Sequence, residues 1–401
     1  MELIHRNLLI GIHDALQETF FEDRKYADKV IERLLKAHKK WGSEDRKVVA
    51  SIFYDIVRWK KRLEYYIGES AKPSNIYRMI VAYCLWSKTH YKKMEELEGV
   101  KIADILTKLK KGTVPSKAFE HSIPDWLVET MERELGKSWE DEMYALNEQA
   151  PTVLRANSLK TTPKALIEEL RAENVESFLV ADYPDAVELE EKKNVFITSA
   201  FKDGLFEVQD ASSQLIGKLL DVKEGMRVVD ACAGAGGKTL HLAALMQNKG
   251  QIIALDIYGW KLTELKRRAK RAGAHNIEAR LIDDNKTIKR LHGTADRLLI
   301  DAPCSGLGVL KRNPDSKWKI DQAFIDRIKI EQQQILTDYC KIIKIGGKML
   351  YATCSILPSE NTKQVQTFLK NNPDYSLLKE EKIMPSQGYD GFYMALIERK
   401  A

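Results

Sequence analysis

From about residue 205 onward, short apolar segments alternate with amphipathic stretches of helical period. The segments typical of strands cover residues 226–231, 251–256, 278–282, 297–301 and 347–352. The helical patterns fall near residues 237–247, 260–272, 322–343 and 360–371. Strands that alternate with helices in this way pair in parallel, because each helix carries the chain back across one face of the sheet. We therefore predict an α/β fold with a doubly wound, mostly parallel sheet.

The first predicted strand leads into a glycine-rich turn, DACAGAGGKT at residues 230–239. Such a turn lets backbone approach a ligand closely. A phosphate-binding P-loop needs glycine where Cys232 stands, and a dinucleotide fingerprint needs glycine where Thr239 stands. Asp256 ends the next strand, where a carboxylate can accept hydrogen bonds from ribose hydroxyls. The pattern favours a nucleoside ligand without phosphates, such as S-adenosylmethionine, over a packing turn with a capping acid.

Three of the five cysteines lie where predicted strands end. Cys232 lies in the glycine-rich turn, Cys304 in DAPCSG at residues 301–306, and Cys354 in YATCS at residues 351–355. Ligands of open α/β sheets bind at the carboxyl ends of strands, so we expect these thiols around one crevice. Chance clustering of buried cysteines is the alternative.

Thiols beside a methyl donor indicate methylation of carbon-5 of a pyrimidine. That carbon is too electron-poor to attack a sulfonium methyl until a thiolate adds at carbon-6, which is covalent catalysis. Asp301 is the candidate for stabilising the adduct at ring N3, and Cys304 is a candidate for assisting release. The spacing does not show which cysteine is the nucleophile.

Basic residues are concentrated in the first third of the chain. Residues 1–120 contain 24 Lys and Arg against 17 Asp and Glu, a net charge of +7, whereas the remaining residues have a net charge of −1. This asymmetry favours a polyanionic partner. A solvated helical surface is the alternative.

The pattern along the chain predicts three domains. These are a helical domain at residues 1–115, a small α/β module at residues 121–204 and the sheet domain at residues 205–401. In the first we expect helices near residues 24–40 and 43–67. In the second we expect a helix near 126–148, strands at 152–155, 187–189 and 195–197, and a helix near 163–173.

The composition also excludes several classes of protein. Five sparse cysteines argue against a disulfide framework and for a reducing cytoplasm. There is no Cys-x-x-Cys pair and the eight histidines are scattered, so we expect no metal site. No apolar run approaches the roughly 18 residues that span a bilayer, and the N-terminus lacks a signal pattern. We expect a cytoplasmic monomer that binds no membrane.

At this point the sequence resembles the RNA (cytosine-5) methyltransferases, a family that includes the bacterial small-subunit rRNA enzyme. The resemblance covers nearly the whole chain. Residues 43–59, SEDRKVVASIFYDIVRW, resemble the antiterminator-like RNA-binding domain of the rRNA branch. The other matching elements are DACAGAGGKT, DAPCSG, KRNPDSKW at 311–318, Gly346-Gly347, YATCS, Pro358, Glu360-Asn361, RANSLKTT at 155–162 and FEVQDASS at 206–213.

The resemblance implies a Rossmann-like S-adenosylmethionine-dependent methyltransferase sheet with an N-terminal all-α domain and a small α/β linker module. It implies that Cys354 is the nucleophile and that Cys304 assists release. For the acid after the third strand, the register favours Asp284 over Asp283. The implied cofactor contacts are Cys232, Ala233, Gly234, Ala235, Gly236, Gly237, Lys238, Asp256, Asp284 and Asp301.

One departure from the family concerns the glycine-rich turn. The family usually has Cys-Ala-Ala-Pro-Gly-Gly-Lys, and Gly234-Ala235 replaces Ala-Pro here. Because proline fixes φ, the replacement loosens the turn. We expect cofactor binding to survive with reduced affinity; a nonfunctional cofactor site is the alternative.

A basic and aromatic segment follows the Pro-Cys motif. Lys311, Arg312, Lys317 and Trp318 suit phosphate contact and stacking on an unpaired base. A structural tryptophan in a capping loop is the alternative for Trp318. A buried target cytosine has to leave its stack to reach the thiol.

The sequence therefore predicts an enzyme that transfers a methyl group from S-adenosylmethionine to carbon-5 of a cytosine in RNA. The expected mechanism passes through a covalent cysteine–cytosine intermediate. The expected substrate is small-subunit (16S) rRNA, so that the product is 5-methylcytosine and the process is rRNA methylation. Two alternatives remain: a tRNA cytosine-5 methyltransferase, and a non-catalytic RNA-binding factor in ribosome assembly.

Overall fold

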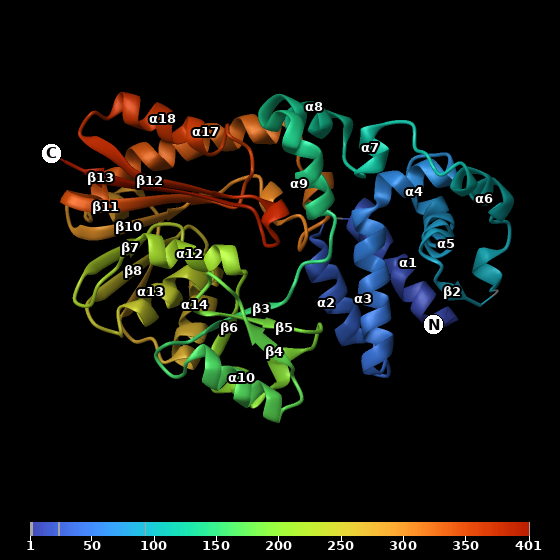
Figure 1. Cartoon of the computed structure of the whole chain (residues 1–401), viewed down its shortest axis with the longest axis horizontal. Helices are drawn as coiled ribbons and strands as arrows, with labels where there is room; N and C mark the ends of the chain where they lie inside the picture. The colour runs from blue at the N-terminus through green and yellow to red at the C-terminus, as the bar shows by residue number, and fades with distance from the viewer. Residues whose placement is uncertain (1–2, 23–24, 93, 401) are drawn as a thin grey trace. The chain divides into compact units, whose positions relative to one another are not determined.

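The structure of the chain is a computed structural model that describes residues 3–22, 25–92 and 94–400 (Figure 1). The chain divides into two compact units. The first comprises Met1–Glu148 and Leu310–Gln322, and the second comprises Gln149–Val309 and Ala323–Ala401. The predicted division at residues 115, 121 and 204 stays a prediction.

The first unit is almost entirely helical. Its fully buried side chains, such as Leu16, Phe53, Leu63 and Ile80, come from the apolar faces of successive helices. A short parallel pair joins β1 (Leu3–Ile4) to β2 (His90–Tyr91). The helices are α1 (Arg6–Phe21), α2 (Ala27–Ala37), α3 (Ser43–Arg58), α4 (Lys60–Ile67), α5 (Ile76–Ser87), α6 (Ile102–Lys110), α7 (Lys117–Glu120), α8 (Asp125–Leu135), α9 (Trp139–Leu146) and α16 (Ser316–Lys319).

Two expected helices are each divided in the structure. The helix expected over residues 43–67 is interrupted at Trp59, whose ψ of 18° leaves the helical range. The helix expected over residues 126–148 stops at Gly136, which has a φ of +60°, a conformation that favours glycine. The spacing of apolar residues predicted which helix faces are buried but not where the helices are interrupted. A change in the backbone angles of one residue does not alter that spacing.

The second unit is built on a seven-stranded sheet in the order β12-β13-β11-β10-β7-β8-β9. Strands β9, β8, β7, β10 and β11 are parallel to one another, and β13 is antiparallel to both β11 and β12. This confirms the predicted α/β sheet, with an antiparallel end that was not predicted. The strands are β7 (Arg227–Asp230), β8 (Gln251–Asp256), β9 (Ile277–Leu281), β10 (Ala295–Asp301), β11 (Ile343–Thr353), β12 (Tyr375–Ile383) and β13 (Phe392–Arg399).

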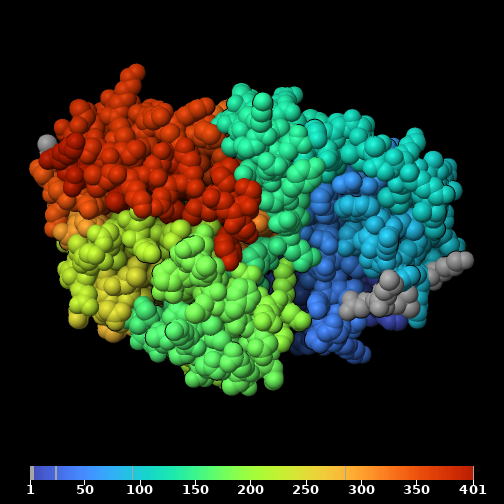
Figure 2. Space-filling view, in the orientation of Figure 1, coloured from blue at the N-terminus to red at the C-terminus, as the bar shows by residue number. Residues whose placement is uncertain are grey.

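Helices cover both faces of this sheet (Figure 1). One face packs against α12 (Ala211–Leu219), α13 (Gly237–Leu245) and α14 (Gly259–Ala272), and the other against α15 (Asn285–Lys289), α17 (Gln322–Tyr339) and α18 (Thr362–Asn371). The central strands β7, β8 and β10 are short, mostly apolar runs, in keeping with their burial on both sides. In the space-filling view, the yellow-green and red parts of this unit form one continuous surface (Figure 2).

A small antiparallel sheet in the order β4-β5-β3-β6 precedes the large one. The predicted strand at 195–197 is wrong: Val195–Ile197 is a 3-10 helix, and the Asn194 side chain caps it by accepting from the Phe196 amide. The elements of this part are β3 (Val153–Ala156), α10 (Pro163–Ala172), β4 (Ser177–Leu179), β5 (Ala186–Leu189), α11 (Ser199–Lys202) and β6 (Phe206–Val208). Within the described ranges, no helix combines the length and apolar character that a membrane span requires.

Candidate active site at the carboxyl ends of the parallel strands

The glycine-rich turn joins the end of β7 to the start of α13. The Gly234 amide donates to the Asp256 carboxylate at the tip of β8 (2.9 Å), and the other oxygen of that carboxylate accepts from the Tyr258 amide (2.8 Å). Asp256 therefore ties the turn to the neighbouring strand. This places the predicted ribose-binding acid directly beside the predicted cofactor turn.

Gly236 can only be glycine in this turn. Its φ is +89°, and a Cβ there would lie 2.6 Å from the Leu265 Cγ. At Gly234, by contrast, a Cβ would meet nothing within 4 Å. The turn thus packs tightly against α14 at one glycine and faces open space at the other, which is the side a ligand needs.

A buried arginine, Arg155, and a partly buried one, Arg268, hold carbonyl groups of the turn. Arg268 donates to the Ala235 carbonyl (2.8 Å), and Arg155 donates to the Gly237 carbonyl (2.6 Å). Glu207 pairs with Arg268 at 2.8 Å. Arg155 and Glu207 were not predicted as site residues, although both lie in the matching segments RANSLKTT and FEVQDASS. A charged residue inside an apolar strand was the available signal.

Lys238 and Asp301 form an ion pair between the turn and the end of β10, with 2.7 Å between Nζ and Oδ2. Burial lowers the pKa of Lys238, but the Asp301 charge and hydrogen bond outweigh it, so the net pKa is raised. Asp301 and Lys238 thus share one charge-balanced site.

At the end of β7, burial raises the pKa of Asp230 to about 7, although the Thr239 hydroxyl donates to its carboxylate (2.7 Å).

The structure brings two of the predicted thiols into contact. The sulfur atoms of Cys304 and Cys354 are 3.3 Å apart, and each follows the end of one of the paired strands β10 and β11. The hydrogen bond with Cys354, together with burial, raises the pKa of Cys304 well above its usual value. Burial and the charges of Asp301, Asp230 and Asp256 raise the pKa of Cys232. The contact with Cys354 and burial thus both favour the protonated form of Cys304.

The acid predicted after the third strand lies at the start of a short helix. Asp284 caps α15 by accepting from the amides of Lys286 (2.7 Å) and Thr287 (3.2 Å). Asp283 accepts from the Thr287 hydroxyl (3.2 Å). The Ile282 amide donates to the Asp256 carbonyl, which holds this segment beside the tip of β8. The choice of Asp284 over Asp283 as a cofactor contact stays a prediction.

The four residues predicted to contact RNA lie in the segment 310–322, which belongs to the helical unit. Lys311 and Lys317 are buried, and the Lys317 ammonium donates to Asn147 (3.3 Å). The Trp318 indole donates to the Val57 carbonyl (2.7 Å). Direct RNA contact does not fit Lys311 and Lys317 in these positions, because their side chains are covered, and the structural alternative fits Trp318. Arg312 is half-buried and stays a predicted RNA contact.

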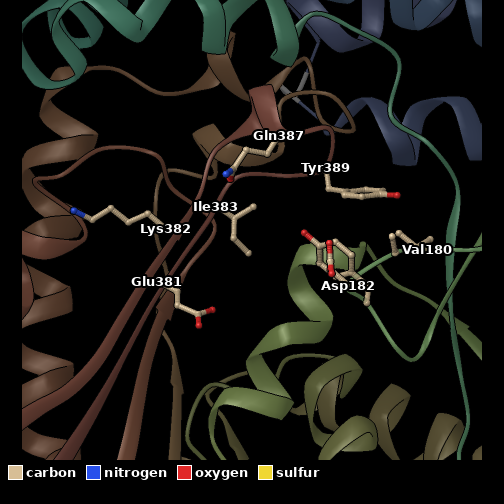
Figure 3. Close-up of a pocket in the computed structure, with 9 residues that line it drawn as sticks. Val180, Asp182, Glu381, Lys382, Ile383, Gln387 and Tyr389 are labelled. Carbon is tan, nitrogen blue, oxygen red and sulfur yellow. The ribbon is translucent and has the colours of Figure 1, made fainter.

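A cavity of about 650 Å³ lies elsewhere in the second unit (Figure 3). Asp182 and Val180, after β4, face Gln387 and Tyr389 across it, and Ile383 of β12 lines it as well. None of its lining residues was predicted as a site residue. The chemistry-bearing side chains thus gather at the strand ends and not in this cavity.

One cluster with metal-ligand atoms occurs among the described residues, in the helical unit. Glu120, His121 and Glu140 lie with their ligand atoms within 4.8 Å of one another. The Lys117 ammonium pairs with both carboxylates, at 3.0 and 2.6 Å. A lysine therefore already supplies the positive charge in this cluster.

Comparison with known proteins places the chain in a family. A family model described as 16S rRNA methyltransferase RsmB/F matches residues 217–397, and one described as an RsmF/B-like, ferredoxin-like domain matches residues 123–196. The chain is 36% identical over 259 residues to the probable ribosomal RNA small subunit methyltransferase B of Synechocystis, covering 64% of this chain. That match spans a little over half of the relative's length, 58%.

Other similarities extend further. The ribosomal RNA small subunit methyltransferase B of Vibrio vulnificus is 32% identical over 299 residues, covering 72% of this chain and 69% of that protein. The crystal structure of PH0851 superposes with a TM-score of 0.84 at 26% identity and covers 99% of both chains. The chain therefore belongs to the 16S rRNA methyltransferase RsmB/F family, whose members depend on S-adenosylmethionine.

Proposed function

We propose that this protein transfers a methyl group from S-adenosylmethionine to carbon-5 of a cytosine in 16S rRNA, through a covalent cysteine–cytosine intermediate. The observation that carries the proposal is the 3.3 Å contact between Cys304 and Cys354 at the ends of β10 and β11. Methylation of a nitrogen or oxygen has no use for such a pair of thiols, whereas carbon-5 of a pyrimidine needs a nucleophile at carbon-6.

The residues of the glycine-rich turn fit the cofactor. Asp256 ends β8 beside the turn, and Gly234 faces open space. Cys232 to Lys238, Asp256, Asp301 and Asp284 are the proposed contacts. Bound S-adenosylmethionine supplies the methyl group as an electrophilic sulfonium methyl.

In the proposed reaction, Cys354 and Cys304 have different roles. The Cys354 thiolate would add to carbon-6 of the cytosine and move the ring electrons toward carbon-5. Carbon-5 would then bond to the methyl carbon as the methyl–sulfur bond of S-adenosylmethionine breaks and S-adenosylhomocysteine leaves. A base removes the proton from carbon-5, the electron pair re-forms the ring double bond, and the bond between carbon-6 and the Cys354 sulfur breaks. Cys304, in contact with Cys354, assists this release. Asp301, held by Lys238, is the proposed contact at ring N3.

The test is transfer of tritiated methyl groups to separated 30S, 16S rRNA and tRNA fractions from a strain that lacks the gene. We expect labelling of the small-subunit RNA at one or more cytosines, mapped by bisulfite sequencing. Cys354→Ala should abolish transfer while S-adenosylmethionine still binds in isothermal titration. Labelling of tRNA alone would move the substrate to tRNA. Full turnover by Cys354→Ala, or RNA binding without transfer by the native chain, would contradict the mechanism.

A further inference from the structure

Glu360, which precedes α18, carries a carboxylate that is completely buried. Its Oε1 accepts from the hydroxyls of Ser305 (2.5 Å) and Ser355 (2.6 Å). Its Oε2 accepts from the Ser305 amide (2.8 Å) and the Gln332 side chain (3.1 Å). Four donors therefore converge on one carboxylate, which offsets the cost of removing its charge from water.

The two serines bound by Glu360 are the residues that directly follow the two cysteines. Ser305 follows Cys304 in the loop after β10, and Ser355 follows Cys354 in the loop after β11. The position of the carboxylate is fixed in turn, since the Tyr351 hydroxyl donates to the Glu360 carbonyl (2.8 Å). One side chain thus joins the two loops that carry the thiols.

The backbone brings the same loops together at a second point. The Gly308 amide donates to the Cys354 carbonyl (2.9 Å). A Cβ at Gly308 would lie 2.8 Å from that carbonyl oxygen and 2.2 Å from the Gly391 oxygen, so this approach requires glycine. The Gly308 contact sets how closely the loops approach, and the carboxylate determines which residues of the two loops lie opposite each other.

We propose that Glu360 is a positioning residue, which holds Cys304 and Cys354 at the thiol separation that the methyl-transfer cycle needs. The catalytic meaning rests on the proposed function, but the separation itself can be measured without any methyl transfer. Glu360 acts through Ser305 and Ser355 and touches neither sulfur.

The first readout is the rate at which Cys304 and Cys354 form a disulfide in the full-length protein. The probe is diamide, a diazene that takes up the two electrons and two protons released as the two thiols form the sulfur–sulfur bond. Mass spectrometry of peptides identifies the pair. Glu360→Ala should slow cross-linking by roughly tenfold, the factor that corresponds to ~1.4 kcal/mol of lost positional preference.

Glu360→Gln separates geometry from charge. Its amide oxygen can face the Ser305 amide and Gln332, and its amide nitrogen can face the serine hydroxyls, which can rotate to accept. We expect this variant to cross-link within a few-fold of wild type. The matched control is Glu380→Gln, because Glu380 accepts from Thr362 and Tyr393, at 2.7 Å each, and contacts neither cysteine loop. This control should match wild type.

A second variant keeps the test valid if Glu360→Ala does not fold. Ser355→Ala removes one of the four hydrogen bonds and keeps the carboxylate, and it should slow cross-linking several-fold. Wild-type rates in either folded variant would overturn the proposal. A Glu360→Gln variant as slow as Glu360→Ala would also overturn it, because charge and not positioning would then be the cause.

The second readout is catalytic and separates this inference from the proposed function. If Cys304→Ala accumulates an RNA–protein adduct, folded Glu360→Ala should accumulate it as well, with a lower kcat and a nearly unchanged KM. An adduct in Cys304→Ala but none in Glu360→Ala would contradict the positioning role of Glu360 and leave the proposed function intact. Loss of the proposed function, seen as full activity in Cys354→Ala, leaves the cross-linking result to decide the positioning role.

Discussion

The sulfur atoms of Cys304 and Cys354 lie 3.3 Å apart although the two residues are 50 positions apart in the chain. The parallel register of β10 with β11 produces this contact, since Asp301 pairs with Ala352 and each cysteine follows shortly after. The sheet therefore sets the separation of the two thiols to first order. The side chains around them then determine what each thiol does.

The first prediction concerns release of the RNA. Cys304→Ala should leave the attack by Cys354 intact and slow the elimination, because the proposed helper in release is gone. We expect a covalent RNA–protein adduct that survives denaturing gel electrophoresis and contains the methylated base. A Cys354→Ala, Cys304→Ala double variant is the control and should form none. Absence of an adduct in the single variant would exclude the release role.

The second prediction concerns the cofactor turn. Gly236→Ala should abolish S-adenosylmethionine binding, because its Cβ would meet Leu265 at 2.6 Å and its φ is +89°. Arg268→Ala removes the hydrogen bond to the Ala235 carbonyl and should weaken binding roughly tenfold, about one hydrogen bond to a charged group. Isothermal titration measures both. The control is Arg267→Ala, because the Arg267 guanidinium pairs with Glu264 on the exposed face of α14 and does not bond to the turn.

The third prediction is a pH dependence of stability. Burial raises the pKa of Asp230 to about 7 from an ordinary 3.8, so between these values the folded chain keeps a proton that the unfolded chain loses. The contribution to stability is complete below about pH 4 and is lost as the pH rises to about 7. Asp230→Asn should reduce the fall in the free energy of unfolding over this pH range, by on the order of 4 kcal/mol at most. Denaturant unfolding at several pH values measures the difference, and parallel curves for the two proteins would contradict it.

The fourth prediction separates a structural from an RNA-binding role for Lys317. Burial, together with the Arg58 charge, lowers the pKa of Lys317 well below its usual value. Lys317→Met should raise the free energy of unfolding by roughly 1–3 kcal/mol and leave the salt dependence of RNA binding unchanged. Arg312→Met is the comparison and should reduce the salt slope by the amount of about one phosphate contact. If Lys317→Met reduced the salt slope by the same amount, Lys317 would have to contact RNA directly, and the structural role would be contradicted.

Much of the sheet could be predicted from the sequence, because its central strands are buried on both faces and form continuous apolar runs. The strand expected at 251–256 corresponds to β8, which is buried along nearly its whole length. The strand expected at 278–282 corresponds within about one residue to β9, although β9 is an edge strand that is only partly covered. β12 was missed because Tyr375–Ile383 is an edge strand whose side chains are mostly exposed and polar, so no apolar run marks it. β13 (Phe392–Arg399) was missed as well, although it is mostly buried and apolar.

The chemistry-bearing residues of the candidate site could be predicted from the sequence, whereas the residues that hold them in place could not. Cys304 and Cys354 could be selected as candidates because each follows a predictable strand, and Asp256 because it ends one. Glu360 had only its place in a matching motif, since nothing local in the sequence shows that its partners are Ser305 and Gln332. The burial of Lys317 was equally hidden, because it depends on packing against residues more than 150 positions away.

The place of residues 310–322 bears on the order in which the protein folds during synthesis. Trp318 bonds to the Val57 carbonyl, Arg58 donates to the Lys311 carbonyl and Asp315 accepts from the Ala27 amide, so the helical unit includes a segment made late. At about 5–20 residues per second, the chain from Glu148 to Gln322 takes ~10–30 s to emerge from the ribosome. Until then, the first 148 residues form an unfinished unit, in which the buried Arg58 lacks one of its partners. A nascent chain stalled in this interval, or a fragment ending near residue 120, is therefore expected to be a better target for proteases than the completed protein.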